Sequence, residues 1–87
     1  MSDEIIFSKS AEKQLLKLDK NIAERLMQKL LEFSRDIPPT SRAKGLTNSK
    51  DAEYRYRVGD YRILFDYNEK LNRIEILKVA HRRDVYE

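Results

Sequence analysis

Hydrophobic residues recur at helical spacing in the first part of the chain. In residues 11–18 and again in residues 22–33, apolar positions return every three or four residues, with charged residues between them. This period predicts two consecutive amphipathic helices that form a hairpin. A short apolar run at residues 5–7 precedes them and predicts a strand, after which Ser8 or Ser10 is suited to cap the first helix.

Turn-forming residues mark where these elements end. Asp19 separates the predicted helices and is suited to cap the second one. Pro38 and Pro39 end the second helix, because proline lacks the backbone donor and the residue before it is pushed out of helical space. Residues 36–52 then show no periodic pattern, and such long loops in compact domains are usually functional or disordered.

The second half of the chain changes to strand patterns. Residues 53–58, 61–67 and 73–80 read as three strands, joined by a tight two-residue turn at Gly59-Asp60 and a looser turn over residues 68–72. A strand, two helices and a three-strand meander predict an α+β fold, with the helix hairpin packed on a largely antiparallel sheet. We expect residues 1–87 to form a single domain.

Composition excludes several classes of protein. The chain has no cysteine and a single histidine, so we expect neither disulfides, thiol catalysis nor a metal site. Its two glycines are too far apart for a P-loop or a dinucleotide-binding motif, and we expect no cofactor. The sequence lacks a run of roughly 20 apolar residues and a basic then apolar leader, so we expect a cytoplasmic protein without a membrane partner.

Arginine is concentrated late in the chain. Arg25 and Arg35 precede residue 40, and seven further arginines follow it. Arginine is suited to forked contacts with phosphate, although a solvated surface of mixed charge is the alternative interpretation of a chain with 38% charged residues.

The tight turn fixes the register of the first two meander strands. Arg57 should lie directly opposite Arg62, with Arg55 on the same face of the sheet. Like charges in this position destabilise a strand pair, and an anion between them would relieve the repulsion. Alternatively, Asp66 neutralises Arg55 across the hairpin, whereas Asp60 is the acid nearest to the pair.

A second basic group lies near the C-terminus. Lys78, His81, Arg82 and Arg83 are followed by Tyr86. A five-residue loop after the second meander strand would place Lys78 on the arginine face, and a four-residue loop would turn it under. His81 has an ordinary pKa, about 6.5, that suits proton transfer, but a plain surface imidazole is equally compatible with its sequence.

The segments YRYRVGDYRI at residues 54–63 and VAHRRDVY at residues 79–86 resemble the RelE branch of the RelE/ParE toxin superfamily. The resemblance extends over essentially the whole chain, including Lys44-Gly45-Leu46. It implies a toxin that enters the ribosomal A site and cuts mRNA, held inactive by a cognate RelB-like antitoxin. The antitoxin should present an amphipathic helix and an extended segment, and operator DNA should be bound only through it.

The resemblance also implies site residues. RNA offers its own 2'-hydroxyl as the nucleophile, so the protein orients the strand, stabilises charge and moves protons. On this basis Arg57 and Arg62 contact the phosphate, and His81 or Tyr86 transfers protons or stacks on a base. The complete expected set comprises catalytic residues Arg57, Arg62, His81, Arg83 and Tyr86, and RNA-binding residues Lys44, Arg55, Lys78 and Arg82.

Departures from the family leave alternatives open. Some members have lysines where this chain has Arg55 and Arg57, and an arginine is too firmly protonated to act as a general base. Some continue into a C-terminal helix, whereas this sequence stops at Glu87. The alternatives are a ParE-type inhibitor of DNA gyrase and a non-catalytic homologue that acts in antitoxin-dependent operator binding.

Overall fold

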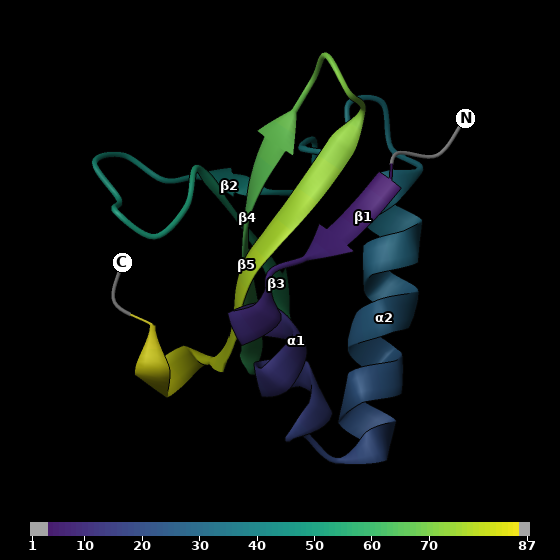
Figure 1. Ribbon diagram of the computed structural model, residues 1–87, viewed down its shortest axis with the longest axis vertical. Coiled ribbons are helices and arrows are strands. Elements are labelled where there is room, and N and C mark those ends of the chain that lie inside the picture. Colours follow the sequence, from purple (N-terminus) through teal and green to yellow (C-terminus); the bar gives the residue numbers. More distant parts are fainter. Residues whose placement is uncertain (1–3, 86–87) are drawn as a thin grey trace.

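The computed structural model describes residues 4–85 and shows an α+β fold of two layers (Figure 1). The elements in chain order are β1 (Glu4–Phe7), α1 (Lys9–Leu16), α2 (Lys20–Ser34), β2 (Lys44–Gly45), β3 (Tyr54–Val58), β4 (Tyr61–Asn68), β5 (Arg73–His81) and the 3₁₀ turn η1 (Arg82–Asp84). The predicted strand, helix hairpin and meander are therefore confirmed. The short strand β2 and the turn η1 were not predicted.

Residues 4–85 contain one five-stranded sheet with the strand order β1-β5-β4-β3-β2. The meander β3-β4-β5 is antiparallel, and β1 pairs in parallel with β5. The helices cover one side of the sheet, whereas the loop after β2 and the turn η1 project on the other (Figure 1). We call the side without helices the open face. No helix of residues 4–85 combines the length and the apolar character that crossing a membrane requires.

The two helices begin as the sequence indicates. Ser8 is the N-cap of α1, and its hydroxyl oxygen accepts a hydrogen bond from the Ala11 backbone N–H at 3.0 Å. Asp19 occupies the N-cap position of α2, but its side chain makes no capping hydrogen bond. The Asp19 carbonyl accepts the first hydrogen bond of the helix, from the Ala23 N–H at 2.9 Å.

The core lies between the helices and the sheet. Tyr56 and Phe65 are fully buried and stack with ring centroids 4.2 Å apart, and Phe33 of α2 packs on Tyr56 at 4.5 Å. The Tyr56 hydroxyl donates to the Pro39 carbonyl at 2.6 Å, so the buried oxygen is satisfied and the segment after α2 is tied to the sheet. The further buried residues of this core are Ala11, Leu26, Leu30, Val58, Ile63, Ile74, Ile76 and Val79.

The region between α2 and β3 is partly ordered by the sheet. Lys44 pairs with Arg55 and Gly45 with Tyr54, which forms β2 at the edge of the sheet. The Leu46 N–H then donates to the Glu53 carbonyl at 2.8 Å and closes a loop over the open face. Two residues are too few to give a readable alternation, which explains why the sequence pattern did not reveal β2.

Candidate nucleic-acid interface

The turn between β3 and β4 sets the register that the sequence predicts. Gly59 has φ 57°, a value that glycine adopts without strain at the first position of a two-residue hairpin turn. Arg57 consequently lies directly opposite Arg62, and Arg55 lies opposite Leu64. Partners in a ladder share a face, so the side chains of these four residues belong to the open face.

A β-bulge brings Lys78 to the same face. The loop between β4 and β5 leaves Asn68 opposite Arg73, which alone would place Lys78 across from Ile63 on the helix side. The register shifts by one residue between Leu64 and Phe65, so that Phe65 pairs with Ile76 and Leu64 with Lys78. One cross-strand row on the open face is therefore Lys44, Arg55, Leu64 and Lys78, and the next is Arg57, Arg62 and Ala80.

Arg62 is the most constrained cation of this surface. Its side chain is 8% exposed, and Nη1 donates to the carbonyls of Gly59 and Tyr61, each at 3.1 Å. Burial is the largest cause that lowers the pKa of Arg62. The positive charges of Arg57, Arg55 and Arg82 lower this pKa further. Burial and neighbouring positive charges therefore both disfavour the charged form of this guanidinium.

Arg55 shows the same electrostatic signature. Burial lowers its pKa, and the charge of Arg57 lowers it further. Arg57 itself is exposed at the centre of the group. We call Arg55, Arg57, Arg62 and Arg82 the arginine cluster.

Arg82 joins the cluster through the turn at Asp60. Its backbone N–H donates to the Asp60 carbonyl at 2.7 Å, and its Nε lies 3.7 Å from the Asp60 carboxylate. Both side chains are about 60% exposed, at 60% and 63%, so this ion pair is weak. The Asp60 carboxylate therefore acts chiefly at the Arg82 edge of the cluster, while it also raises the pKa of Arg62 slightly against the larger lowering causes.

His81 lies apart from the arginine cluster. His81 pairs with Tyr61, a core-facing residue, and their rings meet edge to face with centroids 5.4 Å apart. His81 and Arg83 line a cleft of about 400 Å³, which Lys17 of the helix side and Lys78 of the open face also line. The sequence grouped both residues with Arg57 and Arg62. Strand alternation turns His81 away from that pair, because its partner Tyr61 faces the helices, whereas Arg83 belongs to the turn η1 and follows no strand alternation. The catalytic roles of both residues stay predictions.

His81 has a structural contact of its own. Its Nδ1 accepts a hydrogen bond from the Arg83 backbone N–H at 3.2 Å and caps the turn η1. This bond fixes the tautomer with the proton on Nε2. Tyr86, the remaining predicted catalytic residue, lies outside the described residues.

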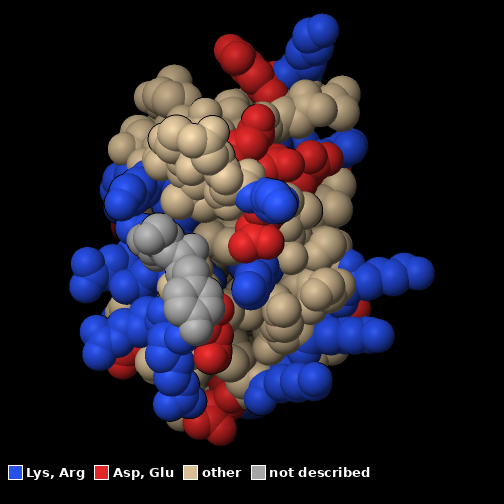
Figure 2. Space-filling view, turned by 90° about the vertical axis from the view of Figure 1, so that its left-hand side faces the viewer, with Lys and Arg blue, Asp and Glu red and all other residues tan. Residues whose placement is uncertain are grey.

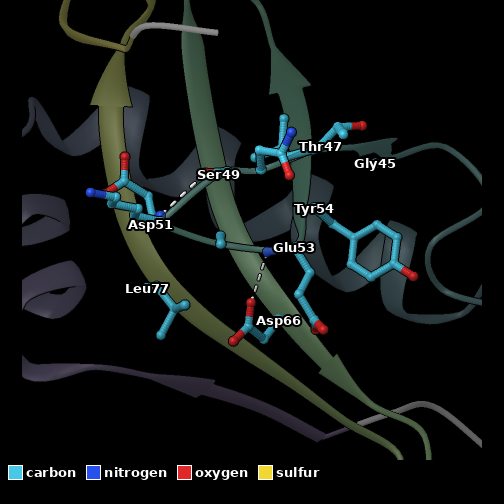
Figure 3. Close-up of a pocket in the computed structure, with 12 residues that line it drawn as sticks. Gly45, Thr47, Ser49, Asp51, Glu53, Tyr54, Asp66 and Leu77 are labelled. Atoms are coloured by element: carbon cyan, nitrogen blue, oxygen red, sulfur yellow. Dashed lines mark hydrogen bonds between the residues drawn. The ribbon is translucent and has the colours of Figure 1, made fainter.

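Acidic residues lie at the end of the open face opposite the arginine cluster. Asp66 pairs with Glu75 across β4 and β5, and its Oδ1 accepts from the Glu53 N–H at 2.9 Å (Figure 3). Asp51, Glu53 and Asp66 line a cavity of about 610 Å³ there. In the space-filling view, Lys and Arg side chains lie along both edges and in the lower part of this face, with carboxylates between them and toward the top (Figure 2). The electrostatics therefore favour the arginine cluster, not the largest cavity, as the place for a polyanion.

Comparison with known proteins identifies the family of the chain. The family profile described as "ParE toxin of type II toxin-antitoxin system, parDE" matches residues 5–86. The chain belongs to the RelE/ParE superfamily of type II toxins. A search of curated protein sequences gives no match.

Solved structures resemble the toxin over nearly its whole length. The RelBE2 toxin-antitoxin complex from Mycobacterium tuberculosis matches with a TM-score of 0.84 and 26% identity, over 97% of this chain and 95% of that one. The archaeal RelE-RelB complex from Pyrococcus horikoshii OT3 matches with a TM-score of 0.75 and 27% identity, over 98% and 100%. The intact RelBE complex of E. coli has a TM-score of 0.74 at 20% identity, over 92% and 96%, and supports the fold. The predicted RelE-type fold and family are thus confirmed, whereas the catalytic and RNA-binding roles stay predictions.

A second cavity of the toxin adjoins the arginine cluster. It measures about 430 Å³ and lies between the loop after β2 and the open face. Its lining comprises Lys44, Gly45, Leu46, Thr47, Asn48, Ser49, Lys50, Asp51, Leu64 and Val85, and we call it the loop cavity. Apart from Lys44, none of these residues was predicted to belong to the site. The only sequence signal was the aperiodic stretch of residues 36–52.

Proposed function

We propose that the toxin is a ribosome-dependent endoribonuclease that cleaves mRNA in the A site and thereby inhibits translation. The observation that carries the proposal is the Arg57–Arg62 cross-strand pair on a face that also carries Arg55, Lys44 and Lys78. A fold does not by itself specify an activity, whereas this group of basic side chains on one face supports the binding of RNA. An RNA phosphate placed between Arg57 and Arg62 offsets their repulsion and gives both guanidinium groups a bidentate acceptor.

The chemistry requires no nucleophile from the protein. The RNA 2'-oxygen attacks the adjacent phosphorus, the bond from phosphorus to the 5'-oxygen breaks, and a 2',3'-cyclic phosphate and a 5'-hydroxyl result. Charge builds up on the non-bridging phosphate oxygens during the attack. Arg62 is held by two backbone carbonyls, so its donors are fixed before the reaction and stabilise this charge without reorganisation. Arg57, which is exposed, approaches the same phosphate from the opposite strand.

Protons leave the 2'-hydroxyl and arrive at the 5'-oxygen during this reaction. Arginine is unsuited to accept them, since it stays protonated. His81 lies toward the helix side of the sheet and its Nδ1 is occupied by the Arg83 N–H. We therefore assign proton transfer or base stacking to Tyr86 rather than to His81, with Lys78 and Lys44 as contacts to the RNA backbone. A positioned acid or base contributes about 10² to 10⁴ in rate.

An antitoxin is the proposed partner. The solved relatives from Mycobacterium tuberculosis and Pyrococcus horikoshii are toxin-antitoxin complexes. On the outer side of α2, Ala23, Met27 and Leu31 line an exposed groove, and Leu31 is 48% exposed. Such a face suits an amphipathic helix of a partner, while an acidic segment would compete with RNA for the arginine cluster. Contact with operator DNA would then come through the antitoxin.

The test is mapping of 5' ends in a translated message, with wild-type toxin and with Arg62→Ala and Arg57→Ala variants. We expect cleavage with the wild type and a loss of at least about 10² with either variant. Arg73→Ala is the matched control, because Arg73 lies on β5 but its Nε bonds the Glu4 carboxylate at 2.9 Å, away from the cluster. Cleavage that persists in Arg62→Ala and Arg57→Ala at the control level would refute the assignment.

A second candidate function is inhibition of DNA gyrase. The observation in its favour is that the matching family profile carries the ParE description. Supercoiling by purified gyrase in the presence of the toxin separates the two candidates: inhibition without mRNA cleavage supports the ParE activity. A chain that neither cleaves mRNA nor inhibits gyrase, and leaves growth normal without antitoxin, would be the non-catalytic homologue.

A further inference from the structure

The loop cavity continues directly from the arginine cluster. Leu64, which lines the cavity, lies opposite Arg55 and two residues along β4 from Arg62. Two residues of a strand span roughly 7 Å. Lys44, on the other side of Arg55, also lines the cavity. A nucleotide whose phosphate is held by the arginine cluster therefore has its base within reach of this cavity.

The lining combines apolar and polar groups in the way a nucleobase requires. Leu46 and Val85 are half-buried and provide apolar surface, next to Leu64, which lines the cavity but is only 2% exposed. Thr47 and Asn48 supply polar side chains, and the loop adds backbone donors and acceptors. Ligand sites of about 300–1,000 Å³ with this mixture are typical of small organic ligands, and the volume of about 430 Å³ lies in that range. Single-stranded RNA is read in this manner, through base faces and base edges.

Hydrogen bonds hold the ends of the loop that lines the cavity and also order its interior. The Leu46 N–H bonds the Glu53 carbonyl at 2.8 Å, so both ends of the loop are held at the edge of the sheet. Within it, the Asp51 N–H donates to the Ser49 hydroxyl oxygen at 3.2 Å, and Asn48 adopts φ 59°. These contacts define the position of the loop before a ligand enters, which favours discrimination between ligands over mere accommodation.

The larger neighbouring cavity is unsuited to the same role. It shares the loop residues 45–51, including Asp51, with the loop cavity, but Glu53 and Asp66 add two further carboxylates to its lining. A nucleotide there would bring its phosphate toward carboxylates and away from the arginine cluster. The charge distribution on the open face therefore selects the loop cavity.

We infer that the loop cavity binds one nucleobase of the RNA and that the loop over residues 46–51 contributes to base preference at the cleavage site. The inference rests on the proposed function and specifies a subsite of it. It assigns Thr47 and Asn48 to base edges, and Leu64 with Val85 to the apolar face of the base.

The first experiment maps 5' ends of a translated message with Thr47→Val and Asn48→Gly variants. Glycine retains the positive φ of Asn48 without its side chain, and valine keeps the shape of Thr47 without its hydroxyl. The ratio of cleavage between bases at the preferred position is expected to change on the order of tenfold, and this ratio, measured within each variant, is the readout. Glu53→Gln is the matched control, since Glu53 lines the other cavity, and it should leave the ratio unchanged. An unchanged ratio in both loop variants would overturn the inference.

The second experiment separates failure of the subsite from failure of the proposed function. Methyl-labelled full-length toxin is titrated with a short RNA that carries a 2'-deoxy nucleotide at the cleavage position. We expect the methyl signals of Leu64 and Val85 to shift together with the side-chain N–H signals of Arg57 and Arg62. If the arginine signals shift and the methyl signals do not, RNA binds but the subsite is wrong. If neither shifts and the wild type cleaves no message, the proposed function fails, and the inference with it.

Discussion

Replacing Arg57 by glutamine should make the toxin more stable. Arg57 is exposed, lies directly across from Arg62, and its charge lowers the pKa of both Arg62 and Arg55. Like charges opposed across a strand pair cost about 0.2–1 kcal/mol, so we expect a gain of about 0.5 kcal/mol in the free energy of unfolding. A domain of this size shifts its Tm by about 4–8 °C for each kcal/mol, which gives a rise of about 2–4 °C.

Urea unfolding of wild type and Arg57→Gln at low and at high salt measures this effect. The gain should be largest at low ionic strength and fade at 1 M salt, where the Debye length falls to about 3 Å. Arg73→Gln is the control, because Arg73 faces the Glu4 carboxylate and its removal should give no gain. An Arg57→Gln protein that is less stable than wild type at low salt, or a gain that salt leaves unchanged, would refute the electrostatic reasoning.

Three further predictions concern the scaffold. Gly59→Ala should destabilise the protein by about 1–2 kcal/mol in urea unfolding, because Gly59 has φ 57°; Gly45→Ala, with no atom within 4 Å of the added carbon, should change stability by less than about 0.5 kcal/mol. Tyr56→Phe should cost about 1 kcal/mol in the same measurement, since it removes the buried 2.6 Å hydrogen bond to a carbonyl. The Arg42 guanidinium, mainly through its hydrogen bond, holds the pKa of Asp36 below its ordinary 3.8. The ionised Asp36 therefore stabilises the folded state above that pH, and this stabilisation is lost as pH falls through the lowered pKa. Arg42→Ala should therefore lower the urea midpoint at pH 7, and the difference from wild type should narrow as pH falls below about 4, to the part that the contact of Arg42 with the Phe33 ring contributes at every pH. A constant difference would contradict the linkage.

The strands and helices could be predicted because their signals are local. Period and capping identified α1 and α2, and the Gly59-Asp60 turn fixed the pairing of β3 with β4 residue by residue. The strand β2 escaped prediction because its two residues are ordered by pairing with β3, a contact between distant parts of the chain. Asp19 shows a similar limit, since its sequence position indicates a cap but not whether the side chain turns toward the helix.

The candidate site was predictable only where the register was. Arg55, Arg57 and Arg62 follow from the tight turn, and the structure brings them together. His81 was grouped with them by closeness in sequence to Arg82, yet alternation along β5 carries it to the other side. Proximity along the chain says little about a face, because neighbouring residues of a strand point in opposite directions.

A one-residue shift in the pairing of β4 with β5 determines whether Lys78 belongs to the candidate site. The turn length alone would have placed it under the sheet, among core residues, where an ammonium group without a partner is costly. The bulge at Leu77 moves Lys78 to the open face while Ile74 and Ile76 keep facing the core. Without the bulge, either Ile74 and Ile76 would leave the core or Lys78 would leave the open face. The bulge therefore allows both the burial of the isoleucines and the exposure of the lysine.

The open face concentrates like charges at two places. Arg57 opposes Arg62 at one end, and Asp66 opposes Glu75 toward the other. Exchanging one member of each pair would give two favourable cross-strand pairs, so this arrangement does not maximise stability. It gives the face a positive and a negative end instead. A polyanion held at the positive end would be repelled from the negative end. Under the proposed function, this repulsion would restrict the directions in which an RNA strand leaves the arginine cluster and would direct it past the loop cavity.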